Sequence, residues 1–301
     1  MGCLNKKQVE KLLLFSGYHC YKNHATTTTT ITTTTTNKTI PLKLPSLYIA
    51  GSGQPFIWMH GMLNSVESDS IYSLIDFDHL SKQVSVVRYN YCDKSVTGNY
   101  SWESLTGELI GIADAKDLGP MILGGSSMGA AIAIHAAVKF PERVKALVLV
   151  TPPPAWEMRT DVKKTYQKIA GKTDSAKIPD FLKRLIAQNQ EPPDFFVQMH
   201  PGTRKRLLEY RMDFEPEYYT KIYSGGAVSD LPPREQIAKI KVPTIIIALP
   251  DDPNHPIEIA QHLQTLISGS ELVIVSSYRN FQDLQKKVLD FTEIVANNNK
   301  S

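Results

Sequence analysis

From about residue 45 onward, short apolar runs alternate with stretches whose apolar residues recur at helical spacing. The runs predict strands over 47–50, 56–59, 84–89, 121–124, 144–150, 244–249 and 271–275. The stretches between them predict helices over 101–115, 130–139, 256–266 and 281–295. Strands that alternate with helices are typical of an α/β protein, in which helices cover both faces of a mostly parallel sheet.

The alternation stops between residues 152 and 239. This part is charged and helical in pattern, and prolines interrupt it, among them Pro179 and Pro201. It lies between the strands predicted over 144–150 and 244–249, so we expect a helical lid inserted late in the sheet. The whole domain is expected to span residues 44–296.

The two ends of the chain differ from this domain. Residues 26–36 are threonine interrupted only by Ile31, a composition that cannot build a packed core. We therefore expect residues 1–43 to be a disordered tail, and residues 297–301 to be a disordered C-terminus. Two alternatives for the first residues stay open: an organellar transit peptide, or acylation at Gly2 and Cys3. Arginine is absent from this leader, and Lys6 stands where myristoylation favours a hydroxyl residue.

Composition narrows the class of protein. The 301 residues are 42% hydrophobic and 21% charged, enough for one sizeable core, and a net charge of +3 gives no reason to expect a nucleic-acid partner. The three cysteines are an odd number, which we interpret as free thiols in a reducing, cytoplasmic setting. No apolar run approaches the roughly 18 residues that span a bilayer, so we expect no stable membrane insertion. No metal and no cofactor are expected.

The most informative segment is Gly125-Ser126-Ser127-Met128-Gly129. An apolar run precedes it and an alanine-rich helical run follows it. A Gly-x-Ser-x-Gly sequence between a strand and a helix is typical of a nucleophile elbow, which exposes the hydroxyl of the central serine, here Ser127. Side chains at positions 125 and 129 would collide with the neighbouring strand and helix, which explains glycine there.

With this elbow, the strand order and the inserted lid, the chain resembles the α/β-hydrolase family, AB hydrolase-1 type, across roughly residues 45–296. The segment from Trp58 to Met62 is similar to the family's His-Gly turn after the third strand. By that resemblance the N–H groups of Met62 and Met128 form the oxyanion hole, in which such donors meet charge that develops in the transition state. His60 and Gly61 are then structural, shaping the turn.

The segment over 242–256 is similar to the family's penultimate strand and acid loop, which puts Asp252 at the position of the triad acid. Such an acid orients an imidazole and stabilises it after it takes the serine proton. An aspartate followed by proline at the end of a strand is also ordinary turn chemistry.

The resemblance fails where the triad histidine belongs. Asn280 stands at about that place, and no histidine follows His262. Three other histidines are candidates for the base. His255 lies three residues after Asp252, His200 lies in the predicted lid, and His135 lies in the helix after the nucleophile, where a packed core histidine is expected.

Two classes of function follow. The first is a serine hydrolase that cleaves a carboxylic ester, thioester or amide through an acyl-enzyme on Ser127, with Asp252 as acid and His255 as the candidate base. The second is a catalytically impaired member of the fold that binds a ligand or partner. The intact elbow favours the enzyme and the missing histidine favours the binder. The predicted lid is rich in aromatic side chains, which is consistent with an apolar small-molecule substrate.

Overall fold

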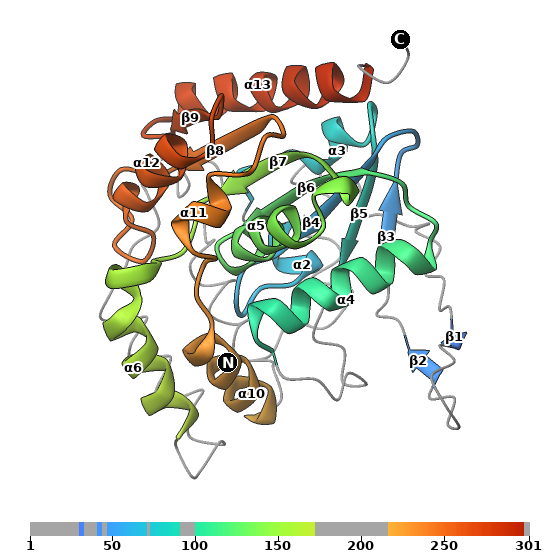
Figure 1. Ribbon diagram of the computed structural model, residues 1–301. Helices are drawn as coiled ribbons and strands as arrows, with labels where there is room; N and C mark the ends of the chain where they lie inside the picture. The colour runs from blue at the N-terminus through green and yellow to red at the C-terminus, as the bar shows by residue number, and fades with distance from the viewer. Residues whose placement is uncertain are drawn as a thin grey trace, which may run out of the picture.

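The computed structural model describes residues 30–32, 41–43, 47–70, 73–90, 100–171 and 216–297. A seven-stranded sheet forms the centre of the molecule (Figure 1). Its strands lie in the order β3 (Leu47–Ala50), β5 (Ser85–Tyr89), β4 (Pro55–Met59), β6 (Met121–Ser126), β7 (Val144–Val150), β8 (Thr244–Ala248) and β9 (Glu271–Ile274). Only β3 runs antiparallel to its neighbour, and every other adjacent pair is parallel. The expected mostly parallel sheet is confirmed.

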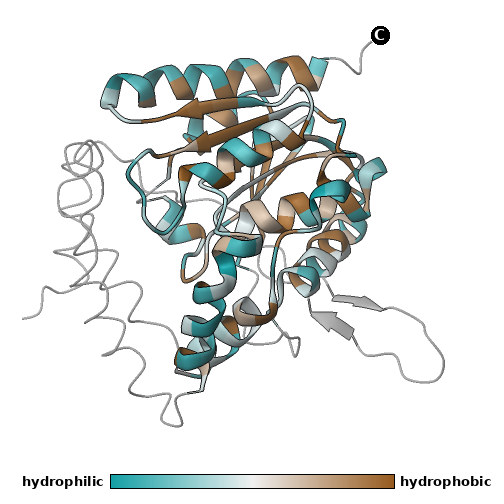
Figure 2. Cartoon of the chain, turned by 60° about the vertical axis from the view of Figure 1, so that its left-hand side comes forward, coloured by the Kyte–Doolittle hydropathy of each residue, from teal (hydrophilic) through white to brown (hydrophobic). Residues whose placement is uncertain are grey.

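Helices cover both faces of this sheet. One face packs against α4 (Trp102–Ala115), α5 (Met128–Lys139), α11 (Arg234–Ile237) and α12 (Ile257–Leu266), and the other against α3 (Phe77–Leu80) and α13 (Tyr278–Asn297). Alternate residues of one strand supply the two cores: Ile57 and Met59 face the first layer, whereas Phe56 and Trp58 face the second. In Figure 2 the strands are mostly hydrophobic (brown), and α13, at the top, alternates between hydrophobic and hydrophilic (teal) residues, as expected for a helix with one buried side.

Side chains fix where several helices begin. Ser101 caps α4 by accepting the N–H of Ser104. Ser65 forms a capping box with Ser68 at the start of α2 (Val66–Asp69), and Asp76 caps α3. The pattern of apolar residues predicts neither α2 nor α3, because a four-residue helix is too short to show helical periodicity.

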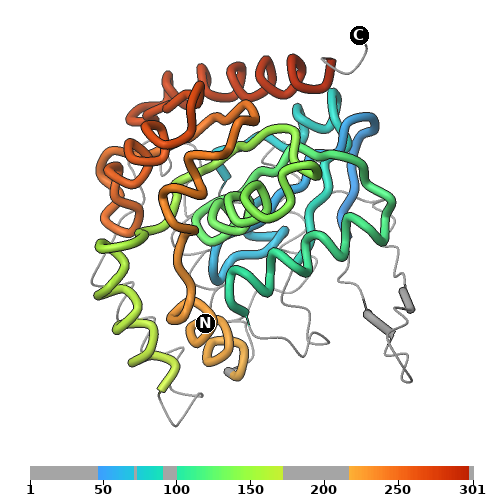
Figure 3. Tube along the Cα trace, viewed as in Figure 1, coloured from blue at the N-terminus to red at the C-terminus, as the bar shows by residue number. Residues whose placement is uncertain are grey.

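The short helix η1 (Pro141–Arg143) leads into β7, and the stretch over 152–239, expected to be a lid, lies between β7 and β8. Its described parts are η2 (Trp156–Arg159), α6 (Thr160–Ala170), α10 (Pro216–Val228) and α11. Helices α6 and α10 pack against each other to one side of the sheet (Figure 3). We call the described stretches 152–171 and 216–239 the first and the second insertion root. The stretch over 172–215 lies outside the described residues, and with it the candidate His200.

The N-terminal part holds one departure from the expected disordered tail. Strands β1 (Thr30–Thr32) and β2 (Pro41–Lys43) pair antiparallel within it. The other residues before 47, the three cysteines and residues 298–301 lie outside the described part of the chain. Within the described part, no helix combines the length and the apolar character needed to cross a membrane.

Candidate active site

Three loops meet at one edge of the sheet. Ser127 follows β6, the turn from His60 to Asn64 follows β4, and the loop over 251–256 follows β8. Because these strands are parallel neighbours or near neighbours, their carboxyl ends open on the same side. This is the edge at which open α/β sheets bind their ligands.

Ser127 occupies a sharp elbow. Its φ of 52° and ψ of −112° lie outside the conformations that most side chains adopt, and its N–H donates to the Val150 carbonyl at 2.9 Å. A Cβ at position 125 would lie 2.4 Å from the Gly129 carbonyl oxygen, and one at position 129 would lie 2.0 Å from the Met59 carbonyl oxygen. Both positions therefore require glycine, as the elbow motif suggests.

Backbone strain gathers at this edge. Leu63 after β4, Ser127 after β6 and Thr151 after β7 all have positive φ values, of 60°, 52° and 41°. Such conformations cost about 1–3 kcal/mol each and persist only where the surrounding structure holds them. Strain at three neighbouring strand ends is the pattern typical of a functional site.

The structure brings Ser127, His255 and Asp252 together. His255 Nε2 lies 2.9 Å from Ser127 Oγ, and His255 Nδ1 lies 2.6 Å from Asp252 Oδ2. Both partners of the serine are largely shielded, with 21% of the His255 side chain and 17% of the Asp252 side chain exposed. In this geometry Nδ1–H donates to the carboxylate and Nε2 accepts the serine O–H.

Burial alone would raise the pKa of Asp252. The hydrogen bond and charge of His255, with the backbone N–H groups of Asn254 and His255, outweigh it and hold the pKa of this carboxyl below its usual range. Asp252 is therefore ionised near neutral pH, as a group that orients and stabilises an imidazolium must be.

Asp252 and His255 lie in the same turn. The N–H of His255 donates to the Asp252 carbonyl at 3.1 Å, and the N–H of Asn254 donates to Asp252 Oδ1 at 2.9 Å. The first bond closes a four-residue turn, and the second fixes the carboxylate within it. The spacing Asp-x-x-His made His255 a candidate base in the sequence, and this turn explains how the spacing brings the two side chains together.

Asn280, which stands where the triad histidine is expected, and the candidate base His135 both bond groups away from Ser127. Asn280 Oδ1 accepts from the hydroxyls of Ser276 and Ser277 at 3.0 and 2.9 Å, at the start of α13. His135 is buried, and its Nε2 donates to the Asp230 carbonyl at 2.8 Å. Burial lowers the pKa of His135, which suits a neutral structural histidine.

The turn after β4, which we call the oxyanion turn, runs from His60 to Asn64. The N–H of Asn64 donates to the Gly61 carbonyl at 3.1 Å, and Leu63 takes the left-handed conformation that closes the turn. His60 is 2% exposed with Nδ1 2.8 Å from the Gly61 carbonyl oxygen, and burial lowers the pKa of His60 to about 4. This neutral histidine is the first residue of the turn and stabilises it, and Met62 is the third residue.

Met128 is the first residue of α5. The first N–H groups of a helix have no acceptor within the helix, and the helix dipole favours negative charge beside them. The backbone N–H of Met128 is therefore suited to donate a hydrogen bond to negative charge that develops next to Ser127.

Sequence reasoning missed two residues of the insertion roots, Arg159 and Asp230. Each is a single charged residue in a charged stretch, and nothing in the pattern marks Arg159 as buried or Asp230 as an acceptor of several hydrogen bonds. Arg159 is 1% exposed, and both Asp230 carboxylate oxygens accept hydrogen bonds, from the N–H groups of Trp156 and Leu231 and from Lys163.

A mostly parallel sheet with a serine on its strand-to-helix elbow, next to an Asp–His pair at the same edge, defines the class of hydrolases built on an α/β sheet. A family model described as alpha/beta hydrolase fold matches residues 102–285, and the chain belongs to that family.

Relatives agree with this assignment. The chain is 25% identical over 249 residues to the 2-hydroxy-6-oxo-2,4-heptadienoate hydrolase of Pseudomonas putida, covering 75% of this chain and 82% of the relative. It is 28% identical over 240 residues to the AB hydrolase superfamily protein YisY of Bacillus subtilis, covering 74% and 83%. A thermophilic esterase from Thermogutta terrifontis shares the fold with a TM-score of 0.74 at 18% identity, covering 90% of this chain and 99% of the esterase. The protein is thus a hydrolase of the α/β family.

Proposed function

We propose that the protein is a serine hydrolase that cleaves a carboxylic ester, thioester or amide through an acyl-enzyme on Ser127. One observation carries this proposal: an unbroken line of hydrogen bonds from Ser127 Oγ through His255 to Asp252, with heavy-atom distances of 2.9 and 2.6 Å. A serine hydroxyl is a weak nucleophile until an adjacent base can take its proton, and this line supplies that base and the group that orients it.

In the first half-reaction, Ser127 Oγ attacks the substrate carbonyl carbon while His255 Nε2 takes the hydroxyl proton. The carbonyl oxygen becomes negative, and the N–H groups of Met62 and Met128 donate to it. The imidazolium then gives its proton to the leaving alcohol, thiol or amine as the bond to the carbonyl carbon breaks. Asp252 stays ionised and stabilises the imidazolium throughout.

In the second half-reaction, water attacks the acyl carbon and gives a proton to His255 Nε2. The same two backbone donors bind the second oxyanion. The bond to Ser127 Oγ breaks, His255 returns the proton to it, and the carboxylic acid leaves. Each donor contributes about 3 kcal/mol, because it meets charge that is present only in the transition state.

We propose that the insertion over 152–239 acts as the lid and that the substrate is a small, largely apolar carbonyl compound. Aromatic side chains of the insertion roots support this, with Tyr166 and Tyr223 in edge contact at 5.2 Å between ring centroids. One curated relative is named as a hydrolase of 2-hydroxy-6-oxo-2,4-heptadienoate, a small carbonyl compound. The alternative is a binding protein without catalysis. A missing base would favour this alternative, whereas the contact of His255 Nε2 with Ser127 Oγ supports the enzyme.

A fluorophosphonate probe tests the proposal directly. Wild-type protein should be labelled, and Ser127→Ala should abolish labelling because the probe bonds to an activated serine oxygen. His255→Ala should slow labelling by about 10³-fold or more, in line with the loss of one member of such a triad. A folded wild-type protein that resists the probe would overturn the proposed function.

The chain offers a matched control for His255. Asp76 and His79 form a second aspartate–histidine pair with the same spacing, and Nδ1 lies 2.7 Å from Asp76 Oδ2. That pair lies at the start of α3, with 58% of the His79 side chain exposed. His79→Ala should therefore leave the labelling rate unchanged.

A further inference from the structure

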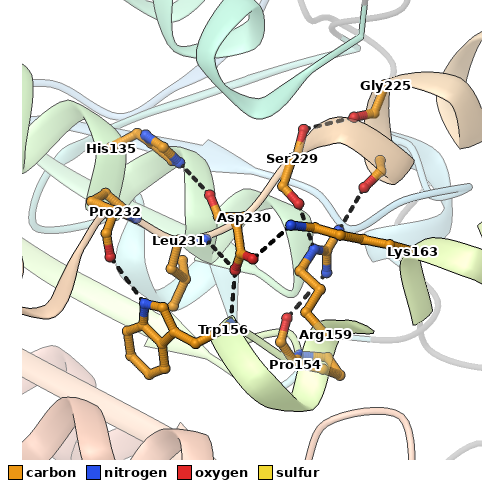
Figure 4. A network of polar contacts seen from close by, with 11 residues as sticks. His135, Pro154, Trp156, Arg159, Lys163, Gly225, Ser229, Asp230, Leu231 and Pro232 are labelled. Carbon is orange, nitrogen blue, oxygen red and sulfur yellow. Dashed lines mark hydrogen bonds and ion pairs between the residues drawn. The ribbon is translucent and has the colours of Figure 1, made fainter. Parts of the chain in front are cut away.

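Several polar contacts join the two insertion roots, and those of Arg159 are the most buried among them (Figure 4). Arg159 Nη1 donates to the Pro154 carbonyl on the first root, at 3.1 Å. Its Nε and Nη2 donate to the carbonyls of Ser229 and Gly226 on the second root, at 2.6 and 2.8 Å. The side chain is 1% exposed, so its position is determined by these three acceptors.

The guanidinium also ties the roots to the body of the domain. Its Cζ lies 4.0 Å from the centroid of Trp102, the first residue of α4, and 5.8 Å from that of Tyr166 in α6. The Trp102 N–H donates to Ser229 Oγ at 2.9 Å, next to the carbonyl that Arg159 binds. Burying a charge among carbonyls is costly compared with an apolar side chain, which argues that this arginine defines a geometry.

The geometry that Arg159 fixes includes the contact between α10 and the oxyanion turn. A Cβ built on Gly226 would lie 2.9 Å from Tyr166 Cδ2 and 3.7 Å from Met62 Sδ. The space beside the Gly226 Cα is therefore bounded by the Tyr166 ring, with the Met62 sulfur next to it, and the carbonyl of this same residue accepts from Arg159 Nη2.

We propose that Arg159 is a positioning residue for the oxyanion hole. It holds the Gly226 segment of α10 against the Met62 side chain and so limits rotation of the peptide group whose N–H binds the oxyanion. This inference rests on the proposed function in one respect, the use of the Met62 N–H as a donor. Small displacements of such a donor matter, because its stabilisation of the transition state depends on distances of about 2.7–3.1 Å.

Kinetics on a p-nitrophenyl ester separate positioning from substrate binding. Arg159→Met should lower kcat about tenfold and leave KM within about twofold, since the donor acts in the transition state and not in the ground state. Arg159→Lys keeps the charge and reaches fewer carbonyls, so it should recover part of kcat. A raised KM with unchanged kcat would contradict the proposal.

Arg234→Met is the matched control. Arg234 also lies in an insertion root, where it stacks on Trp156 at 4.2 Å and bonds Glu157, but no described contact joins it to Gly226. Its replacement should leave kcat and KM within about twofold. Equal effects of the Arg159 and Arg234 variants would sink the inference.

A methyl signal tests the same coupling without catalysis. In protein labelled with ¹³C-methyl methionine, the Met62 resonance is assigned by its loss in Met62→Leu. This resonance should shift or broaden in Arg159→Met and stay in place in Arg234→Met. If wild-type protein showed no hydrolase activity, the proposed function would fail, whereas an unmoved Met62 signal in Arg159→Met would refute the positioning role itself.

Gly226→Ala perturbs the same contact from α10 and is the second test variant if Arg159→Met does not fold. Its Cβ must displace the Tyr166 ring towards a new position, so kcat should fall several-fold and the Met62 signal should move. Gly111→Ala, in α4, is the control, because a Cβ there meets nothing within 4 Å. Identical behaviour of the two alanine variants would contradict the inference.

Discussion

At the scale of single residues, the chemistry proposed for the site depends on two contacts of His255, with Ser127 Oγ at 2.9 Å and with Asp252 Oδ2 at 2.6 Å. The pattern Gly-x-Ser-x-Gly identified Ser127 as a candidate nucleophile, and Asp252 as its acid followed from resemblance. The base could not be assigned with the same ease, because the usual place holds Asn280. Only the turn geometry brings His255 Nδ1 to 2.6 Å from Asp252, and turn geometry is weakly encoded in a four-residue stretch.

Asp252→Asn should lower kcat on an ester substrate by about 10³–10⁴-fold, because an amide neither stabilises an imidazolium nor enforces the required tautomer. The fold should survive, since the Asn254 N–H can still donate to the amide oxygen. Steady-state kinetics together with a thermal unfolding curve check both statements. Turnover near the wild-type level would show that His255 acts without Asp252.

Asp69 is a buried carboxyl that should make the stability of the protein depend on pH. This carboxyl is 3% exposed and accepts from Trp58 Nε1 at 2.6 Å. Burial raises the pKa of Asp69 to about 7, against the lowering effects of the Trp58 hydrogen bond and of Arg88, while Glu67 adds to the rise. In the unfolded chain an aspartate has a pKa of about 4. Between about pH 4 and pH 7 the folded state therefore binds the extra proton, and its stability falls as the pH rises.

Asp69→Asn mimics the protonated carboxyl and removes this pH dependence. Its free energy of unfolding should match that of wild type near pH 4 and exceed it increasingly up to about pH 7, by at most about 1.4 kcal/mol per pH unit. Urea unfolding at several pH values gives the difference between the two proteins. His60, whose lowered pKa acts in the opposite direction, is present in both and cancels. A difference that does not vary with pH would contradict the prediction.

At the scale of elements, the spacing of apolar residues predicted the strands of the sheet and the longer helices that cover it. The apolar runs over 47–50 and 144–150 match β3 and β7. Helix boundaries differ from the prediction where side-chain contacts determine them. Helix α13 begins at Tyr278 and not at residue 281, because Asn280 bonds Ser276 and Ser277 just before its start. The pairing of β1 with β2 could not be predicted, because threonine repeats give no register.

One element-scale prediction concerns the approach of α10 to the segment before α4. A Cβ at Gly225 would lie 2.2 Å from the Tyr100 carbonyl oxygen, which is backbone and cannot swing aside. Gly225→Ala should therefore lower the free energy of unfolding by about 1–3 kcal/mol. Gly107→Ala in α4, where a Cβ meets nothing within 4 Å, should have no such cost. Chemical denaturation of the two variants compares them, and equal stability would show that α10 can move away freely.

At the scale of the whole molecule, the insertion roots belong to the same folded unit as the sheet. His135 of α5 bonds the Asp230 carbonyl, and the start of α4 bonds Ser229. Neither tie was visible in the sequence, because buried polar contacts between distant segments leave no periodic signal. The consequence is that α6 and α10 should not open independently of the body.

Amide hydrogen exchange tests this cooperativity. Peptides from α10 should be protected nearly as strongly as peptides from α5, because both share the contacts of Ser229 and Asp230. Arg159→Met should accelerate exchange in α6 and α10 more than in α5. Rapid exchange of α10 in wild-type protein would mean that the insertion opens as a separate unit.

The turn that holds both Asp252 and His255 has a consequence for how the chain can be cut and rejoined. If the base followed the last strand, new termini placed between β9 and the base would separate it from the acid along the chain. Here Ser127, Asp252 and the candidate base His255 all precede residue 256, so a circular permutant opened at Ser276–Ser277, whose side chains are exposed, keeps the three on one uninterrupted stretch. The last strand and helix then serve as a scaffold that engineering can reshape without redesigning the chemistry.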